Sequence, residues 1–139
     1  MNTASPAEAR ADLGVDPRRI LIVDDDCDVR LALVALLRAE GFTVTEAPDG
    51  REALRILRTS GEVFGLVVLD LMMPVMNGWQ FRREQQEDPA LASIPVLVLS
   101  AGANVGEVAA SIGAVGYIKK PINLEELLGV VQRSLGQGD

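Results

Sequence analysis

The sequence contains no histidine and a single cysteine, and these shortages exclude several kinds of site. Histidine is the commonest zinc ligand and the commonest general base, so neither a typical zinc centre nor a histidine-based catalytic site is expected. Cys27 cannot form a disulfide within the chain, and the carboxylates beside it disfavour its thiolate form. A redox role is therefore not expected.

Long apolar runs and clustered positive charge are also missing. No apolar stretch approaches the ~20 residues that span a bilayer, and the N-terminus lacks the hydrophobic segment of a secretion signal. We therefore expect a cytoplasmic protein. Lys and Arg number 13 against 20 Asp and Glu, a formal charge of −7 that argues against binding to a nucleic-acid backbone.

The sequence does contain enough apolar material for one compact domain. Hydrophobic residues make up 48% of the 139 residues and charged residues 24%, proportions at which a chain of this length builds a proper core. Residues 1–17 show no sustained periodicity and are expected to form a flexible arm, with a helical turn near residues 7–13 as its one candidate element. Residues 18–137 are expected to form the domain.

Five short aliphatic segments alternate with segments of helical periodicity. The strand candidates are residues 20–23, 42–46, 66–69, 96–99 and 115–118. Three of them are continuously apolar, which favours strands covered on both faces, as in a parallel sheet. Apolar residues at helical spacing predict helices over about 29–37, 50–57, 79–88, 104–112 and 124–135.

Local signals support these helices and lead to a fold class. Asp49 with Glu52, and Asn123 with Glu126, have the spacing of capping pairs. The helix over 104–112 is the weakest, because glycines flank it. Strands that alternate with helices require right-handed crossovers, so the expected fold class is α/β: a three-layer, doubly wound (βα)5 sandwich around a parallel sheet.

Polar residues directly follow four of the predicted strands. Asp24, Asp25 and Asp26 follow the first, Asp70 the third, Ser100 the fourth and Lys120 the fifth. The carboxyl ends of parallel strands meet at one edge of a sheet, which is where ligands of such folds bind. Asp26 or Asp28 has the place of a helix cap and needs no further role. Ser100 or Lys120 alone would be an ordinary surface residue, so the weight comes from the joint placement.

The clustered carboxylates raise the question of what neutralises them. Like charges repel, so the arrangement is sensible if a divalent cation binds there. Mg²⁺ takes oxygen ligands from one or two carboxylates together with phosphate oxygens. A carboxylate that attacks phosphorus needs its repulsion with the phosphoryl oxygens cancelled, which a metal ion and a lysine ammonium can do. Asp24, Asp25, Asp70, Ser100 and Lys120 supply these parts.

From residue 18 to about residue 135, the sequence resembles the receiver domains of two-component response regulators. The resemblance is carried by ILIVDDD, VVLDLMMPVMNG, LVLSAG and GYIKKP, and it implies a flavodoxin-like fold with sheet order 2-1-3-4-5. Three positions depart from the family pattern. Ser100 replaces the commoner Thr, Asn77 stands where Asp is frequent, and Ile122 stands where Phe is usual. Of these, the missing methyl group at position 100 could loosen the packing of the switch hydroxyl.

The resemblance also assigns a role to each motif residue. It makes Asp70 the phosphorylated residue, and Asp24, Asp25, Asp70 and the backbone carbonyl of Met72 the ligands of Mg²⁺. Ser100, the backbone N–H of Ala101 and Lys120 would contact the phosphoryl group, and Ser100 and Tyr117 would be the switch residues. In this family the Lys-Pro peptide bond, here Lys120-Pro121, is commonly cis.

The implied function is that of a phosphorylatable receiver in a phosphorelay. The phosphoryl donor would be a phosphohistidine on a sensor histidine kinase or a histidine phosphotransfer protein. The chain would catalyse its own phosphorylation and lose the labile acyl phosphate by hydrolysis, without being a conventional turnover enzyme. We expect no output domain after residue 137, and we therefore expect output through residues 104–112, 115–118 and 124–135, to a downstream protein or to another copy in a phosphorylation-dependent dimer.

Three other functions are possible for this fold class, and the sequence favours each of them less. A receiver-like module could dock partners without being phosphorylated, although every chemical position is filled here. A phosphatase of the haloacid dehalogenase type would need a second aspartate at position 72, where Met72 stands. A flavodoxin-like electron carrier would need a hydroxyl-rich loop after the first strand, where this chain has carboxylates.

Overall fold

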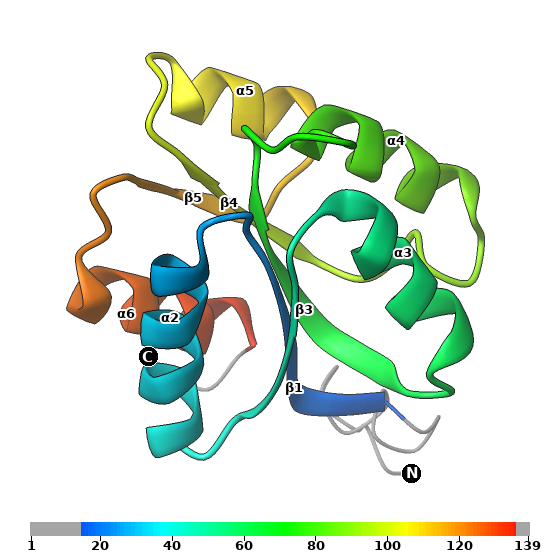
Figure 1. The fold of residues 1–139 in the computed structure, drawn as a ribbon, viewed down its shortest axis with the longest axis horizontal. Coiled ribbons are helices and arrows are strands. Elements are labelled where there is room, and N and C mark those ends of the chain that lie inside the picture. Colours follow the sequence, from blue (N-terminus) through cyan, green and yellow to red (C-terminus); the bar gives the residue numbers. More distant parts are fainter. Residues whose placement is uncertain (1–14, 136–139) are drawn as a thin grey trace, which may run out of the picture.

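The computed structural model describes residues 15–135 and shows a parallel sheet between two layers of helices (Figure 1). The strands are β1 (Val15–Val23), β2 (Thr43–Ala47), β3 (Val63–Asp70), β4 (Val96–Ser100) and β5 (Gly116–Lys119). The helices are α2 (Cys27–Ala39), α3 (Gly50–Thr59), α4 (Gly78–Glu87), α5 (Val105–Ser111) and α6 (Leu124–Ser134). All five predicted strands and all five predicted helices are therefore present.

The start of the domain differs from the sequence prediction. β1 begins at Val15, and its backbone pairs with β3 at Val15 and Asp16 before a register shift near Ile20. Backbone pairing needs no apolar side chain, so the sequence pattern did not mark residues 15–17 as part of the strand. The predicted arm therefore ends no later than residue 14. The helical turn predicted near residues 7–13 lies outside the described residues.

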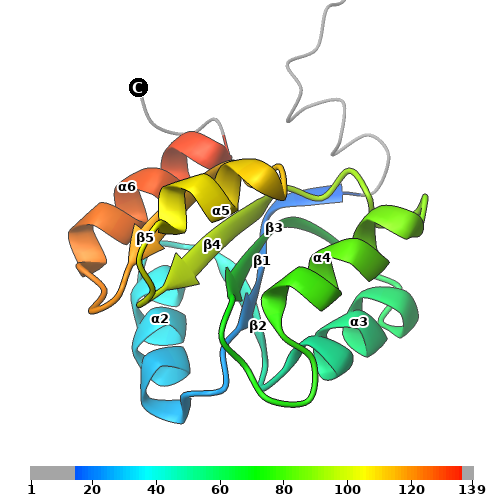
Figure 2. The same cartoon turned by 90° about the horizontal axis from the view of Figure 1, so that it is seen from above.

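The order of the strands confirms the predicted fold. Every neighbouring pair is parallel, and the sheet order is β2-β1-β3-β4-β5. Helices α2 and α6 cover one face, and α3, α4 and α5 cover the other (Figures 1 and 2). This is the three-layer, doubly wound arrangement of flavodoxin-like folds.

Alternate residues of the strands supply the two halves of the core. Ile20 and Ile22 pack with residues of α2 and α6, whereas Leu21 and Val23 pack with residues of α3, α4 and α5. Successive side chains of a strand point to opposite faces, and here both faces are covered. This explains why the strand sequences are continuously apolar.

Most helices begin at the caps that the sequence predicts. The side chain of Asp26 accepts hydrogen bonds from the N–H groups of Asp28 and Val29 at the start of α2. Asp49 and Asn123 accept from the third helical residue of α3 and α6. The third aspartate of the acidic run is thus a cap, which leaves Asp24 and Asp25 for other roles. Within residues 15–135, no helix is long and apolar enough to cross a membrane.

Candidate metal and phosphoryl site

The ends of β1 and β3 bring three carboxylates together. β1 pairs with β3 up to Val23 and Leu69, so Asp24, which follows β1, lies beside Asp70, the last residue of β3. One carboxylate oxygen from each of Asp24, Asp25 and Asp70 lies within 4.8 Å of the others. Asp24 is 0% exposed and Asp70 is 2% exposed, whereas Asp25 is exposed. Two of the three charges therefore lie in a nearly dry environment.

Lys120 brings the one cation of the cluster. Its Nζ lies 2.8 Å from Asp24 Oδ2 and 3.3 Å from Asp70 Oδ2. The residue follows β5, where its backbone N–H donates to the carbonyl of Ser100 at 2.9 Å, and its peptide bond to Pro121 is cis. Its neighbour Lys119 is exposed. The lysine directly before the proline is thus the one that reaches the carboxylates.

The electrostatics of the cluster are unbalanced. Burial, together with the charge of Asp24, raises the pKa of Asp70 to about 6, against the opposing effect of the Met72 N–H and of Lys120. Burial alone would lower the pKa of Lys120, but its ion pairs with Asp24 and Asp70 outweigh this and raise it. One ammonium therefore faces two buried carboxylates and a third at the surface.

One carboxylate oxygen shows where a ligand fits. Asp24 Oδ1 accepts a hydrogen bond from the N–H of Asp26 at 2.9 Å. Asp24 Oδ2 is buried and makes no regular hydrogen bond in the part of the chain that the structure describes, but the ammonium of Lys120 lies 2.8 Å from it. Buried polar atoms are normally satisfied. An under-satisfied oxygen among carboxylates with excess negative charge fits a hard divalent cation such as Mg²⁺.

The loop after β3 is packed tightly against the phosphoacceptor candidate. The Met72 N–H donates to Asp70 Oδ1 at 3.1 Å, which fixes the orientation of that carboxylate. α4 begins at Gly78, where an added Cβ would lie 2.7 Å from Leu71 Cδ2 and 2.8 Å from Leu71 Cα. A side chain at position 78 would collide with the backbone of this loop. The first turn of α4 therefore rests directly on the end of β3.

The two predicted switch residues lie on neighbouring strands but in different environments. Ser100 ends β4, is 4% exposed, and its Oγ accepts from the Gly102 N–H at 3.1 Å. Tyr117 of β5 is 47% exposed, and its ring lies against α5, where a Cβ added to Gly106 would be 3.2 Å from Tyr117 Cε1. The tyrosine thus points outward in this structure, and the absence of a side chain at position 106 makes room for its ring.

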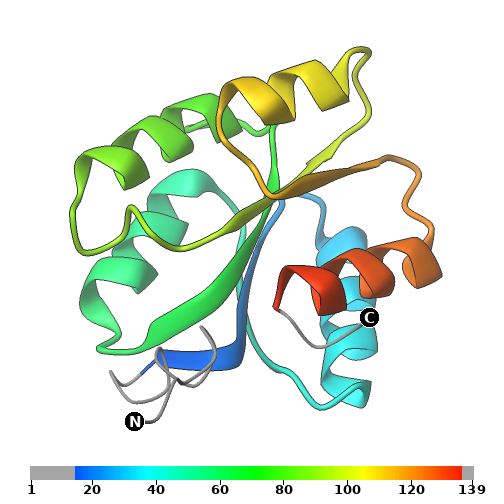
Figure 3. The same cartoon turned by 180° about the vertical axis from the view of Figure 1, so that it is seen from behind.

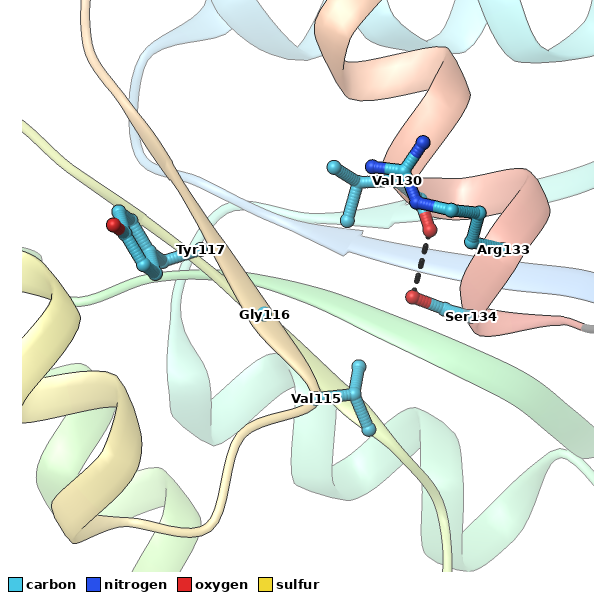
Figure 4. Close-up of a pocket in the computed structure, with 6 residues that line it drawn as sticks. All are labelled: Val115, Gly116, Tyr117, Val130, Arg133 and Ser134. Atoms are coloured by element: carbon cyan, nitrogen blue, oxygen red, sulfur yellow. Dashed lines mark hydrogen bonds between the residues drawn. The ribbon is translucent and has the colours of Figure 1, made fainter.

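A second concave region lies away from the carboxylates. A cavity of about 470 Å³ between β5 and α6 is lined by Val115, Gly116, Tyr117, Val130, Arg133 and Ser134 (Figure 4). Its lining includes neither the carboxylates of the cluster nor Lys120. It belongs instead to the face formed by α5, β5 and α6, which the sequence predicts as the output surface.

Sequence reasoning missed one buried polar pair outside this site. Arg82 and Gln85 of α4 are 7% and 0% exposed, although arginine and glutamine are usually at the surface. A signal was available in the composition of the helix. Between residues 78 and 87 the apolar side chains are Trp79 and Phe81, so a helix packed on a sheet had to bury polar residues as well.

Comparisons with known proteins point to one family. The family model of the response regulator receiver domain matches residues 20–132. Among curated proteins, the response regulator MprA of Mycolicibacterium vanbaalenii is 42% identical over 81% of this chain and 48% of its own length. The regulatory protein SphR of Synechococcus elongatus, described as controlling alkaline phosphatase synthesis, is 39% identical over 79% of this chain and 46% of its own. The chain thus spans about half the length of these relatives.

Solved structures resemble the chain over almost their whole length. The chemotaxis response regulator CheY4 of Vibrio cholerae superimposes with a TM-score of 0.76 at 31% identity, over 84% of this chain and 97% of its own. A response regulator from Chloroflexus aurantiacus gives a TM-score of 0.78 at 28% identity, over 87% of this chain and 99% of its own.

Proposed function

This chain belongs to the family of response regulator receiver domains, and we propose that it accepts a phosphoryl group on Asp70 with Mg²⁺ as cofactor. It is therefore a receiver domain of the two-component type, and a docking module without phosphorylation is not favoured. The observation that carries the proposal is the nearly buried Asp70, which lies beside a second buried aspartate and within 3.3 Å of Lys120.

The carboxylates have separate tasks in this proposal. Asp24, Asp25, Asp70 and the backbone carbonyl of Met72 would hold Mg²⁺, which when bound would offset the negative charge of the phosphoryl oxygens. Asp70 supplies the nucleophile, and its pKa of about 6 leaves it mostly ionised at neutral pH. The O–P bond to Asp70 forms as the bond from phosphorus to the histidine nitrogen of the donor breaks on the opposite side.

The remaining site residues stabilise the product and transmit its charge. Lys120 is held at the cluster by its ion pairs with both buried carboxylates, where its ammonium can pair with a phosphoryl oxygen. Ser100 Oγ and the Ala101 N–H would contact the other oxygens, and Tyr117 would turn inward behind the displaced hydroxyl. The chain would catalyse its own phosphorylation, and the acyl phosphate, which is labile, would be lost by hydrolysis.

The partners follow from the same assignment. Receiver domains of this family interact with histidine kinases and with downstream effectors. The donor here would be a sensor histidine kinase or a histidine phosphotransfer protein. The effector, or a second copy of the chain, would bind the face of α5, β5 and α6. Support for this face comes from the exposed side chains of Val115 and Tyr117 and from the cavity beside them.

The direct test is phosphoryl uptake measured by intact mass. Wild-type protein incubated with Mg²⁺ and a small acyl phosphate should gain one phosphoryl group, and Asp70→Asn should gain none, because the amide is not a nucleophile for phosphorus. Asp28→Asn is the matched control, since this exposed aspartate lies outside the cluster. Equal uptake by Asp70→Asn and wild type would overturn the assignment of Asp70.

A further inference from the structure

A buried polar network joins α4 to the far end of α5. Arg82 donates through Nε to the carbonyl of Ile112 at 2.8 Å and through Nη2 to the carbonyl of Gly113 at 3.1 Å. Its Nη1 donates to Gln85 Oε1 at 2.9 Å. In the described residues, no carboxylate pairs with Arg82. The guanidinium thus binds backbone carbonyls and a side-chain amide rather than a carboxylate.

Gln85 restrains the side chain of Arg82 through a hydrogen bond. Its Nε2 donates to the carbonyls of Leu91 and Ile94, at 3.0 and 2.9 Å, in the connection that leads to β4. Its amide oxygen is thereby aimed at Arg82. Because the glutamine is fully buried and bonded on both sides of its amide, it restrains the position of the guanidinium.

The C-terminal end of α5 is closed by two devices at once. Gly113 adopts a left-handed backbone with φ 69, the Ala114 N–H bonds the Ala109 carbonyl, and the Gly113 N–H bonds the Ala110 carbonyl. This pattern closes the helix with a glycine. Arg82 binds the next carbonyls beyond the helix, those of Ile112 and Gly113. Positive charge at this end also matches the helix dipole.

The N-terminal end of α5 has no comparable support. Asn104 stands at the cap position with φ 60, and its side chain makes no capping hydrogen bond. The connection from Ser100 enters the helix at this end. Val105 packs in the core at this end, and the Val108 N–H bonds the Asn104 carbonyl at 3.0 Å, but no side chain caps the first turn. The two ends of this short helix therefore differ in their side-chain hydrogen bonds, because Arg82 binds the C-terminal end and no such residue binds the N-terminal end within the described residues.

α4 links the restrained end to the phosphorylation site. Gly78 begins α4 in contact with the backbone of Asp70 and Leu71, and Arg82 follows one turn later on the same side of the helix. α4 and α5 lie next to each other on one face of the sheet, green and yellow to orange in Figure 3. The helix that rests on the phosphoacceptor loop is thus the one that holds the end of α5.

We propose that Arg82 is a positioning residue that anchors the C-terminal end of α5, so that the helix pivots about Ile112 and Gly113 when Asp70 is phosphorylated. The proposal rests on the proposed function for its trigger, but the anchor exists without it. Gly106 lies in the N-terminal half of α5, where no side chain caps the helix, and next to the ring of Tyr117. A pivot about the far end would therefore move the surface against which the tyrosine rests.

The anchor itself is tested without phosphorylation, by amide hydrogen exchange. Arg82→Met keeps a stem of similar length and removes the fork, so the amides of Ile112, Gly113 and Ala114 should exchange about tenfold faster, the order expected for loss of a charge-assisted hydrogen bond. Arg82→Lys keeps the charge but not the forked guanidinium, so its exchange rates should lie between those of wild type and Arg82→Met. This variant replaces Arg82→Met in the test if Arg82→Met does not fold. Arg83→Met is the control, since Arg83 is exposed on the same helix.

The pivot is tested through the only tyrosine and the only tryptophan of the chain. With fluorinated tyrosine and tryptophan, ¹⁹F NMR reports Tyr117 near α5 and Trp79 at the start of α4 separately. At equal phosphoryl occupancy, measured by intact mass, Arg82→Lys should keep the shift of Trp79 and lose at least about half of the shift of Tyr117. A fold defect alone would move both signals.

Two results would overturn the proposal. One is exchange at residues 112–114 that is the same in both Arg82 variants as in wild type. The other is a Tyr117 response per phosphoryl group equal to that of wild type. If wild type takes up no phosphoryl group, the proposed function fails instead, and the exchange measurement still decides whether Arg82 is an anchor.

Discussion

Two polar clusters lie inside an otherwise apolar core, and they differ in how well they are satisfied. In the cluster of Arg82 and Gln85, each side chain bonds the other as well as backbone carbonyls. In the cluster of Asp24 and Asp70, two buried carboxylates share one lysine, and Asp24 Oδ2 makes no regular hydrogen bond among the described residues.

The cluster of Arg82 and Gln85 stabilises the fold, whereas the cluster of Asp24 and Asp70 has the charge of a ligand-binding site. A fully bonded buried network specifies one arrangement and is costly to break. A cluster with excess charge is unfavourable as it stands, and a cation or a proton relieves it. The raised pKa of Asp70 is the electrostatic sign of that second condition.

The largest effect is expected where the satisfied network is broken. Gln85→Ala leaves the carbonyl of Ile94 and one donor of Arg82 without these partners in a buried space, and it leaves the carbonyl of Leu91 with the Ile94 N–H alone. We expect a loss of about 3 to 5 kcal/mol in the free energy of unfolding. Urea denaturation followed by Trp79 fluorescence measures it, with the exposed Gln86→Ala as control at about 0.5 kcal/mol or less. If Gln85→Ala and Gln86→Ala lowered the free energy of unfolding by similar amounts, the buried network would not stabilise the fold as described.

A smaller effect of opposite sign is expected in the strained cluster. The pKa of Asp70 is about 6 in the folded protein against 3.8 for the free group, so its stabilising contribution is fully present below about pH 3.8 and lost as the pH rises through about 6. Asp70→Asn has no carboxyl group to ionise at this position, so it does not lose this stability as the pH rises. Without divalent ions, its free energy of unfolding relative to wild type should therefore rise by up to about 3 kcal/mol between pH 4 and pH 7.5.

Denaturation at a series of pH values checks this expectation. Asp25→Asn is the control, because Asp25 is exposed and its charge is solvated. A difference between Asp70→Asn and wild type that stays flat with pH would mean that Asp70 carries no electrostatic strain.

The smallest effect concerns the exposed member of the acidic cluster. Asp25→Ala removes one of three carboxylates that lie within 4.8 Å of one another, and we expect Mg²⁺ affinity to fall about tenfold, or about 1.4 kcal/mol. Titration with Mg²⁺ followed by the fluorescence of Trp79 measures the affinity. Asp26→Asn is the control, since Asp26 caps α2 instead. An unchanged affinity in Asp25→Ala would remove the basis for a shared ion.

The fold was readable from the sequence because its signals are local. Successive strand residues such as Val67 and Val68 are apolar and face opposite sides of the sheet, and caps such as Asp49 and Asn123 act within three residues of their partners. The start of β1 was missed because Val15 and Asp16 join the sheet through backbone pairing and residues 15–17 follow no apolar pattern.

The candidate site was readable in part for a different reason. Parallel strands place their carboxyl ends at one edge, so Asp24, Asp70 and Lys120 could be predicted to meet before any distance was known. The unequal burial of Asp24 and Asp25, and the outward position of Tyr117 against Gly106, were not readable. Both depend on which segment packs over the residue, and neighbours in sequence do not report that.

The sequence by itself determined the alternation of strands and helices, the edge of the sheet at which the charged residues gather, and the chemistry that these residue types allow. Only the tertiary structure decided that Arg82 and Gln85 are buried and that the guanidinium closes a helix 30 residues away in the chain. The physical reason is that periodicity reports which face of an element is buried. The partner of a buried polar group is set by how distant elements pack, because a hydrogen bond requires particular atoms to meet within about 3 Å.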